Sequence, residues 1–359
     1  MLELKNDVRS LEELFEKNRH VVLYGAGASA RLLLQSKGWL FPQDSLEYIV
    51  DGNENLDGVC LEIDEKIRIQ VISLKHFCEM WGEKVRRFTF LFTPYYSLFM
   101  VKQLDAVEAL NGMKAYIHPF IVEQTPNQDF PLRSTDKALI PKKIHYFWLG
   151  HTKMPEEYQK NIESWRYFCP DYEILCWNES NFDFGEYPYA REAIEYGQYM
   201  FATDVARKKV LYDHGGIYFD TDVELLRPID DLLYNEAFIG IDEGGQLNSG
   251  SGLGAVKHNC IIRDMLELYE EKHFAEKDGS FNMYYNTFYE TQYMIKKGFE
   301  LGNRYQKIES VSCFPRTVLM PGGVVGLQDM YTEKTMADHK INPYDQSEVA
   351  AVRKRMYQK

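Results

Sequence analysis

The sequence contains few cysteines and no cysteine motif. The six cysteines among the 359 residues stand at positions 60, 78, 169, 176, 260 and 313, and none forms a C-x-x-C pair. A thiolate zinc site or a dense disulfide framework needs closely spaced cysteines, so neither is expected to organise this fold. Scattered free thiols are typical of proteins in a reducing compartment.

Long apolar runs are also missing. The nearest approach is the stretch from residue 88 to residue 101, which Pro94 interrupts. A transmembrane helix needs about 20 consecutive apolar residues. The opening segment, residues 1–18, mixes charges with leucines and lacks the apolar centre of a signal peptide. We therefore expect a cytoplasmic protein without a transmembrane segment.

Positive charge is in deficit. Lysine and arginine number 41 against 54 aspartates and glutamates, so the net charge is -13. An extended nucleic-acid surface needs clustered lysine and arginine, and we predict no nucleic-acid partner. The hydrophobic content of 45% is by contrast ordinary for a globular chain long enough to hold two cores.

The first part of the chain alternates short apolar strands with helical segments. The strand expected at residues 21–24 runs into a glycine turn, which opens a helical pattern. Further strands are expected at 46–50, 70–72, 88–92 and 115–117, with helices at 74–81 and 97–110. This alternation predicts a Rossmann-like, doubly wound parallel sheet over residues 1–122.

The glycine turn makes nucleotide binding a hypothesis for this first domain. Gly25 and Gly27 form a G-x-G-x-x-A pattern with Ala30. Asp51 ends the next strand, near the position of the ribose-binding acid in dinucleotide folds. The same glycines are equally well explained by close packing of a strand against a helix.

A polar segment with two prolines, residues 123–139, separates this domain from the rest of the chain. It shows no apolar period and is predicted to be a linker. A second α/β domain begins at Ile140 and is expected to extend to residue 359.

The second domain is organised around the stretch from residue 199 to residue 230. Apolar residues at helical spacing predict a helix that ends near His214, where Gly215-Gly216 supplies the stop. On this helix Asp204 and Arg207 stand three residues apart. They therefore share one face and can address one ligand together.

Two carboxylates follow the next strand. Residues 217–219 predict a buried strand that leads into Asp220-Thr221-Asp222. Side chains at i and i+2 of an extended segment point the same way, so Asp220 and Asp222 should converge. Carboxylate oxygens without a neighbouring cysteine or histidine favour Mg²⁺ or Mn²⁺ over zinc. An isolated Asp-x-Asp has only about one chance in ten of being a metal site, and the preceding strand and helix raise that chance.

These residues also match a known family. Asp204, Arg207, Gly215-Gly216, Tyr218 and Asp220-x-Asp222 resemble the signature of Asp-x-Asp sugar transferases of glycosyltransferase family 32. That family includes capsular-polysaccharide sugar transferases and α-mannosyltransferases, and its core is similar to that of the large glucosylating bacterial toxins. The resemblance implies a GT-A-type catalytic domain over residues 140–359.

The resemblance further implies a reaction. A hexose passes, with retention, from a nucleotide-diphosphate sugar to a glycan or lipid-linked acceptor, as in the synthesis of surface polysaccharides. UDP-sugars are the favoured donors, and contact with a membrane would be peripheral. Asp222, helped by Asp220, would clamp Mn²⁺ or Mg²⁺ against the diphosphate, while Asp204 and Arg207 would bind hydroxyls of the donor sugar.

Other donor contacts are expected from the strand that starts at Ile140 and from a run of small residues near Asn248. The resemblance places the indole of Trp148 against the donor base, next to Leu149, because stacking of this kind is worth about 1–3 kcal/mol. Tyr218 and Asn248 would complete the donor site. Without the resemblance, Trp148 would be assigned to the core.

The third metal ligand is left open. The family usually ends with a histidine followed by Ser-Trp, but no tryptophan follows His339 here. His339, Asp338 and Asn342 are all candidates.

Three other points are open in the sequence. Asp242 and Glu243 are the loop carboxylates to test for a covalent role in retention, and Thr291 and Gln292 are expected to face the cleft. A non-catalytic nucleotide-sugar sensor would keep Trp148 and Asp222 without turnover. A nicotinamide-dependent sugar oxidoreductase would instead use the glycine turn of the first domain and need no metal.

Overall fold

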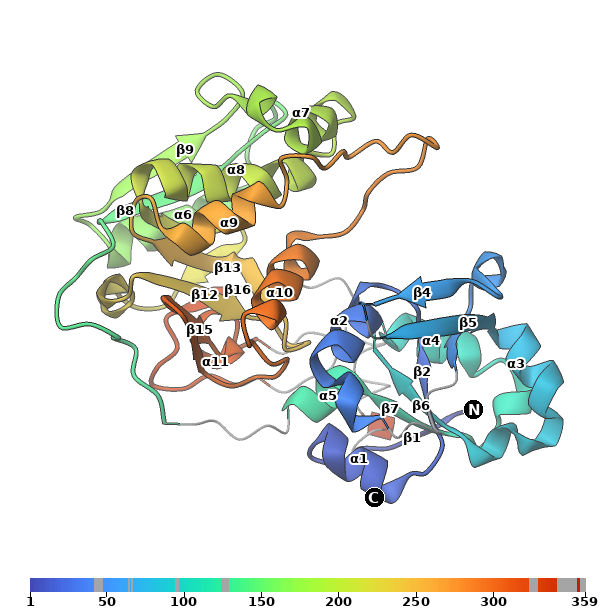
Figure 1. The fold of residues 1–359 in the computed structure, drawn as a ribbon. Coiled ribbons are helices and arrows are strands. Elements are labelled where there is room, and N and C mark those ends of the chain that lie inside the picture. Colours follow the sequence, from blue (N-terminus) through green and yellow to red (C-terminus); the bar gives the residue numbers. More distant parts are fainter. Residues whose placement is uncertain are drawn as a thin grey trace.

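The computed structural model describes residues 1–41, 48–63, 65, 67–93, 97–123, 129–322, 329–340 and 354–355. Within these residues the chain forms two seven-stranded sheets and one two-stranded ribbon. Helices flank both sheets, and the two units lie next to each other (Figure 1). The predicted α/β class is confirmed in both parts of the chain.

The first sheet has the strand order β1-β7-β6-β2-β3-β5-β4. All its pairs are parallel except β4 with β5. The chain winds outward from β2 in both directions, so the predicted doubly wound topology is confirmed. Its elements are β1 (Glu3–Leu4), α1 (Leu11–Lys17), β2 (Val21–Tyr24), α2 (Ala28–Lys37), β3 (Tyr48–Asp51), β4 (Cys60–Glu62), β5 (Arg68–Ser73), α3 (Leu74–Trp81), β6 (Thr89–Phe92), α4 (Ser97–Leu104), β7 (Lys114–Ile117) and α5 (His118–Glu123).

One predicted helix in this unit is shorter than expected. The helix predicted for residues 97–110 ends at Leu104. Beyond it the amides of Ala106 and Val107 bond to carbonyls three residues back, at 3.3 and 3.0 Å, so the chain tightens into turns.

The second sheet is mixed, with the order β14-β15-β12-β13-β10-β8-β9. Strand β10 lies inside the sheet, parallel to β8 on one side and antiparallel to β13 on the other. The elements are β8 (Lys143–Phe147), α6 (Glu156–Phe168), β9 (Glu173–Trp177), α7 (Pro188–Glu195), α8 (Tyr199–His214), β10 (Gly216–Tyr218), β11 (Val223–Leu225), β12 (Ala237–Ile241), β13 (Leu247–Ala255), α9 (Cys260–Glu267), α10 (Asn286–Lys296), β14 (Gln306–Ile308), β15 (Val311–Phe314), α11 (Arg316–Leu319) and β16 (Ala337–His339).

Helix α8 is buried along most of its length. It ends at His214, as predicted from the Gly215-Gly216 pair. Gly215 adopts a φ of 63°, and its amide bonds to the Leu211 carbonyl at 2.8 Å. A residue with a Cβ is strained in this left-handed conformation, which explains the glycine. The turn sends the chain directly into β10.

The two units are joined by polar and apolar contacts. Ser29 Oγ accepts a hydrogen bond from Gln246 Nε2 at 3.3 Å, and Lys37 pairs with Glu300 at 2.8 Å. Met320, from the second half of the chain, packs into the core of the first sheet. Residues 129–139, in the predicted linker, form no helix or strand, and residues 124–128 lie outside the described part. In the described part of the chain, no helix combines the length and apolarity needed to span a bilayer.

Candidate active site

The Asp-x-Asp motif forms a turn between β10 and β11. The amide of Val223 bonds to the Asp220 carbonyl at 3.1 Å, so the chain reverses at Thr221. The expectation that both aspartates extend a strand is therefore wrong, because this bond closes the segment. Both carboxylates nevertheless line one cavity of about 620 Å³.

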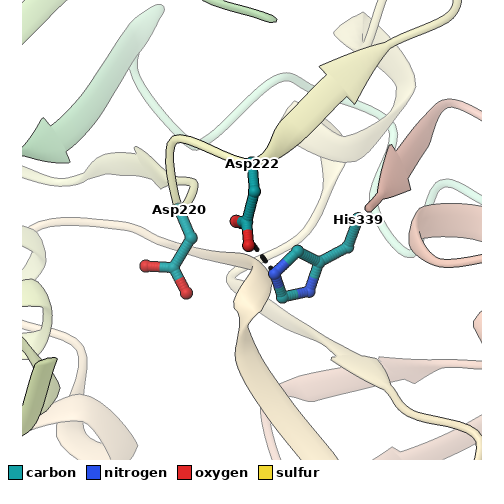
Figure 2. Close-up of side chains that lie close together, drawn as sticks. All are labelled: Asp220, Asp222 and His339. Atoms are coloured by element: carbon teal, nitrogen blue, oxygen red, sulfur yellow. Dashed lines mark ion pairs between the residues drawn. The ribbon is translucent and has the colours of Figure 1, made fainter. Parts of the chain in front are cut away.

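A histidine from the far end of the chain completes the cluster. Strand β16 pairs antiparallel with β11 and sets His339 opposite Val223. The imidazole Nε2 then lies 3.0 Å from Asp222 Oδ1, as Figure 2 shows. Ligand atoms of Asp220, Asp222 and His339 all lie within 4.8 Å of one another.

Asp338, a second candidate for the third ligand, is not part of this cluster. Asp338 precedes His339 on the strand and accepts hydrogen bonds from the Tyr331 hydroxyl at 2.7 Å and the Gly322 amide at 3.2 Å. Successive side chains of a strand point to opposite faces, which separates the two neighbours. Asn342 lies outside the described residues.

The cluster fits a divalent cation. Asp222 Oδ1 is buried against the imidazole of His339, and the other ring nitrogen of that histidine, Nδ1, is buried with no hydrogen-bond partner among the described residues. Neighbouring ligands of an octahedral ion with bonds of about 2.1 Å lie about 3 Å apart, close to the spacing of Asp222 and His339. Two carboxylates and an imidazole also form a common donor set for a divalent ion.

Protons compete with a cation for these groups. Burial raises the pKa of Asp222, but the charge and hydrogen bond of His339, together with a backbone hydrogen bond and the charge of Arg207, outweigh burial, and the pKa is lowered overall. Burial lowers the pKa of His339, while Asp222 raises it above its usual value. A cation needs the imidazole in its neutral form, so acid should weaken metal binding.

Asp204 and Arg207 lie beside the cluster and are almost completely buried, at 1% and 2% exposure. Arg207 Nη2 lies 3.1 Å from Asp204 Oδ1 and 3.4 Å from Asp220 Oδ1. Burial raises the pKa of the Asp204 carboxyl to about 7, against the opposing charge of Arg207. The arginine thus links the helix to the Asp-x-Asp turn, and both side chains line the cavity.

A second buried ion pair links helix α8 to helix α10. Lys208 and Glu290 are both fully buried, and their charged atoms lie 2.7 Å apart. Ser249 donates to Glu290 at 2.7 Å, and Asn286 donates to Ser249 at 2.8 Å. Sequence patterns missed this network because Lys208 follows Arg207 directly and its partner lies on α10. A lysine within the apolar face of α8 was the available signal.

Tyr218 is buried and orients one of the acids. Its hydroxyl donates to Asp220 Oδ1 at 2.6 Å, and the Arg207 guanidinium lies 4.7 Å from its ring centroid. Tyr218 is not among the described residues that line the cavity. Its contacts therefore point to a positioning role rather than direct contact with a donor.

Other predicted donor residues lie at different depths. Asn248 lines the cavity, and its Oδ1 accepts from the Gly250 amide at 2.9 Å. Leu149 is buried in the core. Trp148 is half-buried outside the cavity lining, with its ring 5.8 Å from that of Tyr158. Burial and, to a smaller extent, the charge of Asp222 raise the pKa of Tyr158, so Tyr158 lies within electrostatic range of Asp222.

The loops after β12 and at the start of α10 revise two expectations. Asp242 lines the cavity, whereas Glu243 is buried outside its lining, at 1% exposure. Thr291 is fully buried and accepts a hydrogen bond from the Leu247 amide at 2.9 Å. Its predicted place at the cleft is wrong, because α10 presents its first turn to the cavity, and Gln292 is also outside the lining.

The small residues after β12 allow a close approach within the protein itself. A Cβ on Gly250 would lie 2.1 Å from Asp220 Oδ2. The glycine therefore makes room for the carboxylate, in addition to any space it leaves for a ligand.

The glycine turn of the first domain faces the same cavity. Gly27 contributes to the lining, and Gly25 adopts a φ of 99°. Asp51 does not line the cavity. Its Oδ2 accepts from the Ala26 amide at 2.7 Å and its Oδ1 from the Asn53 amide at 2.8 Å. The predicted ribose-binding acid thus holds its own turn together.

Comparison with known proteins agrees with this geometry. Residues 155–239 match the family described as "Glycosyltransferase sugar-binding region containing DXD motif". Inositol phosphoceramide mannosyltransferase 3 of Schizosaccharomyces pombe is 36% identical over 110 residues, which cover 30% of this chain and 31% of that protein. Inositol phosphoceramide mannosyltransferase 2 of the same yeast is 29% identical over 170 residues, covering 44% of this chain and 48% of that protein.

The likeness is partial in both kinds of comparison. The chain spans less than half of the length of these two relatives. A solved glycosyltransferase involved in glycosylation of the major capsid of PBCV-1 aligns with 60% of this chain and 100% of its own, at 12% identity and a TM-score of 0.33. Residues 155–239 of this chain match the DXD-containing sugar-binding region of glycosyltransferases, which confirms the resemblance seen in the sequence.

Proposed function

We propose that the protein is a divalent-metal-dependent glycosyltransferase that moves a hexose from a nucleotide-diphosphate sugar to an acceptor hydroxyl. One observation carries the proposal. Asp220, Asp222 and His339 converge within 4.8 Å, and the two acids line one cavity with Asp204 and Arg207. The DXD region of residues 155–239 supports the same assignment.

Asp220, Asp222 and His339 would hold the metal ion. When bound, such an ion supplies positive charge to the oxygens of a departing diphosphate. Arg207 keeps Asp220 in place through contacts of 3.4 Å to both carboxylate oxygens, and the Tyr218 hydroxyl donates to Oδ1 at 2.6 Å. A carboxylate held by two neighbours needs little reorganisation when charge develops, which is the condition for strong electrostatic catalysis.

Asp204 and Arg207 would orient the donor sugar. Asp204 Oδ2 already accepts from the Asn286 amide at 3.1 Å, and Arg207 Nη1 lies 3.4 Å from Ser249 Oγ. These bonds lock both side chains on the cavity wall, so hydroxyls placed there meet fixed donors and acceptors.

The histidine sharpens the choice of metal. The sequence alone favoured Mg²⁺ or Mn²⁺ equally, because it placed only carboxylates at the turn. An imidazole ligand binds Mn²⁺ better than Mg²⁺, which prefers oxygen ligands and water. We therefore expect Mn²⁺ to support turnover better than Mg²⁺.

The donor base would lie on the side of Trp148. Tyr158 connects that tryptophan to the surroundings of Asp222. UDP-sugars remain the favoured donors, and the acceptor would be a glycan or a lipid-linked molecule. Transfer would retain the configuration at the anomeric carbon. The proposed role is surface polysaccharide synthesis, in the cytoplasm. The names of the two yeast relatives make mannose a candidate hexose. Asp242 is the cavity carboxylate to test for a covalent step.

A panel of UDP- and GDP-sugars tests this function. The purified protein is incubated with each donor, with Mn²⁺ or with a chelator, and release of the nucleoside diphosphate is followed. We expect slow, Mn²⁺-dependent hydrolysis of at least one donor. No release from any donor would favour a nucleotide-sugar sensor. Metal-independent reduction of a nicotinamide would favour the oxidoreductase.

A further inference from the structure

The cavity of the Asp-x-Asp site has a second wall that comes from the first domain. Gly27–Ala30 and Thr93 line it together with Asp220 and Asp222. These lining residues follow β2 and β6, which are adjacent parallel strands of the first sheet. The chain winds away from this pair in opposite directions, so they mark the switch point where doubly wound sheets bind ligands.

The crevice at this switch point is joined to the catalytic domain. Ser29 Oγ accepts from Gln246 Nε2 at 3.3 Å, across the boundary between the domains. The two oxygens of Asp51 accept from the amides of Ala26 and Asn53, at 2.7 and 2.8 Å. The acid that would bind a ribose is thus engaged within its own loop. The crevice is better described as part of the catalytic cavity than as a separate dinucleotide site.

The cavity that the glycine turn lines also has an aromatic wall. The segment from Met283 to Phe288 lines the cavity with Tyr284, Tyr285 and Phe288. Aromatic faces carry partial negative charge and attract the C–H bonds on the flat side of a sugar ring. Gln246 and Thr287 line the same space and offer neutral hydrogen-bonding groups. This combination of aromatic faces with a few amides and hydroxyls suits a carbohydrate.

The cavity offers little positive charge to an anionic acceptor. Among the described residues that line it, only Arg207 and His339 can be cationic. Arg207 lies 3.1 Å from Asp204 and 3.4 Å from Asp220, and His339 lies 3.0 Å from Asp222, so both already face a carboxylate. The N-terminus of α2 contributes only about half a positive charge. A phosphate-bearing acceptor would find no lysine or arginine on the wall formed by the first domain, whereas a neutral glycan needs none.

We propose that Gly27–Ala30 and Thr93 form the acceptor subsite, which binds a neutral glycan against the aromatic segment 283–288. The first domain is then one half of the active site and not an independent nucleotide-binding module. This assignment rests on the proposed function, in which the donor binds at the side of the cavity that Asp222 lines.

Gly27 offers a direct way to fill this subsite. It is exposed, its φ is -79°, and a Cβ placed on it meets no atom within 4 Å. A Cβ can therefore be added at Gly27 without a steric clash. Gly27→Phe should occupy the subsite, and Gly27→Ala should leave most of it open. Glu79→Phe, on an exposed position of α3, controls for the added aromatic ring.

The test measures retention of the full-length protein on an array of neutral, phosphorylated and carboxylated glycans, in the presence of UDP and Mn²⁺. We expect the wild type to retain neutral glycans. Gly27→Phe should retain at least tenfold less neutral glycan than the wild type, whereas Gly27→Ala and Glu79→Phe should retain as much as the wild type. Thermal midpoints and Mn²⁺ affinity establish that fold and metal cluster are intact in each variant.

Three results would overturn the proposal: full retention by Gly27→Phe, retention of anionic glycans alone, or no retention by the wild type. Failure of the proposed function is separable, because it shows as absent donor hydrolysis in the wild type. That result does not depend on which glycans the protein retains.

Discussion

Two strand ends meet at the cavity, and they use their acids differently. After β2, the glycine turn is held by Asp51, whose oxygens accept from the amides of Ala26 and Asn53. After β10, Asp222 Oδ1 lies buried against the His339 imidazole at 3.0 Å, and the other ring nitrogen, Nδ1, has no hydrogen-bond partner among the described residues. An acid whose oxygens accept from backbone amides stabilises a loop. A buried acid paired with an imidazole brings two metal-binding groups together, as a cation site requires.

The supporting structure differs in the same way. The turn after β10 rests on a buried chain of charges, in which Asp204, Arg207, Lys208 and Glu290 are each at most 2% exposed. Burying charged groups is costly unless they are paired, and paired groups hold one geometry closely. The carboxylates of the Asp-x-Asp turn are therefore held by rigid neighbours, as a catalytic site requires.

The largest expected effect comes from Asp222→Asn. The amide removes one charge from the metal cluster while keeping the shape of the side chain, so donor hydrolysis should fall by at least about 100-fold. The thermal midpoint should change little. Asp338→Asn, one residue from His339 but outside the cluster, is the matched control and should retain most activity. If Asp222→Asn hydrolysed the donor at the wild-type rate, Asp222 would not be a catalytic acid, and its contrast with Asp51 would be lost.

His339→Ala should act through metal affinity. Loss of the imidazole leaves two carboxylates, so the Mn²⁺ concentration for half-maximal hydrolysis should rise by about 10- to 100-fold. Excess Mn²⁺ should restore much of the rate, and the preference for Mn²⁺ over Mg²⁺ should shrink. His20→Ala, at an exposed position of the first domain, serves as the comparison. An unchanged Mn²⁺ dependence would remove His339 from the ligand set.

Trp148→Ala should mainly raise the donor KM. Loss of a stacking surface worth about 1–3 kcal/mol predicts a rise of about 5- to 100-fold, with kcat less affected. Tyr167→Ala removes an aromatic ring that is 77% exposed and should leave KM unchanged. An unaltered KM in Trp148→Ala would assign the tryptophan to packing alone.

Asp242→Asn should stabilise the protein in a pH-dependent way. Burial raises the pKa of Asp242 from 3.8 to about 7, so the folded state disfavours the charged form. The folded wild type binds a proton there that the unfolded chain has lost, and stability falls as pH rises through this window. The increase in the free energy of unfolding on Asp242→Asn should be near zero at pH 4 and about 2–4 kcal/mol above pH 7. Thermal midpoints measured across this range, with Asp136→Asn as an exposed control, test the sign.

Asp51→Ala should have the smallest catalytic effect. It removes the two bonds that hold the glycine turn and should cost about 1–3 kcal/mol of stability. Donor hydrolysis should stay within about threefold of wild type, in contrast to Asp222→Asn. Urea unfolding and diphosphate release measured on the same samples make the comparison. Loss of all hydrolysis in Asp51→Ala would instead place a nucleotide at the first strand end.

Local patterns predicted much of this architecture. The apolar runs of the first sheet and the glycine stop after His214 follow from short-range rules of burial and backbone conformation, and both were found where expected. The turn at Asp220 was not predictable, because the sequence of these residues is equally compatible with a strand. The turn is defined only by the hydrogen bond from the Val223 amide to the Asp220 carbonyl.

Local patterns do not specify contacts between distant segments. The family resemblance made His339 one of three candidate ligands, but only the pairing of β11 with β16 brings it to Asp222, and nothing local specifies that register. Lys208 finds Glu290 on another helix. Similarly, the glycine turn looked like a separate module, because a sequence does not show that its crevice opens on the second domain.

Mn²⁺ binding followed by electron paramagnetic resonance tests the metal cluster most directly. Bound Mn²⁺ loses the sharp six-line signal of the free ion, so a titration in the presence of UDP counts sites. We predict one ion per chain in the wild type, weaker binding in His339→Ala and no binding at this site in Asp222→Asn. A wild type that binds no Mn²⁺, or an Asp222→Asn protein that binds it as tightly as the wild type, would contradict the assignment.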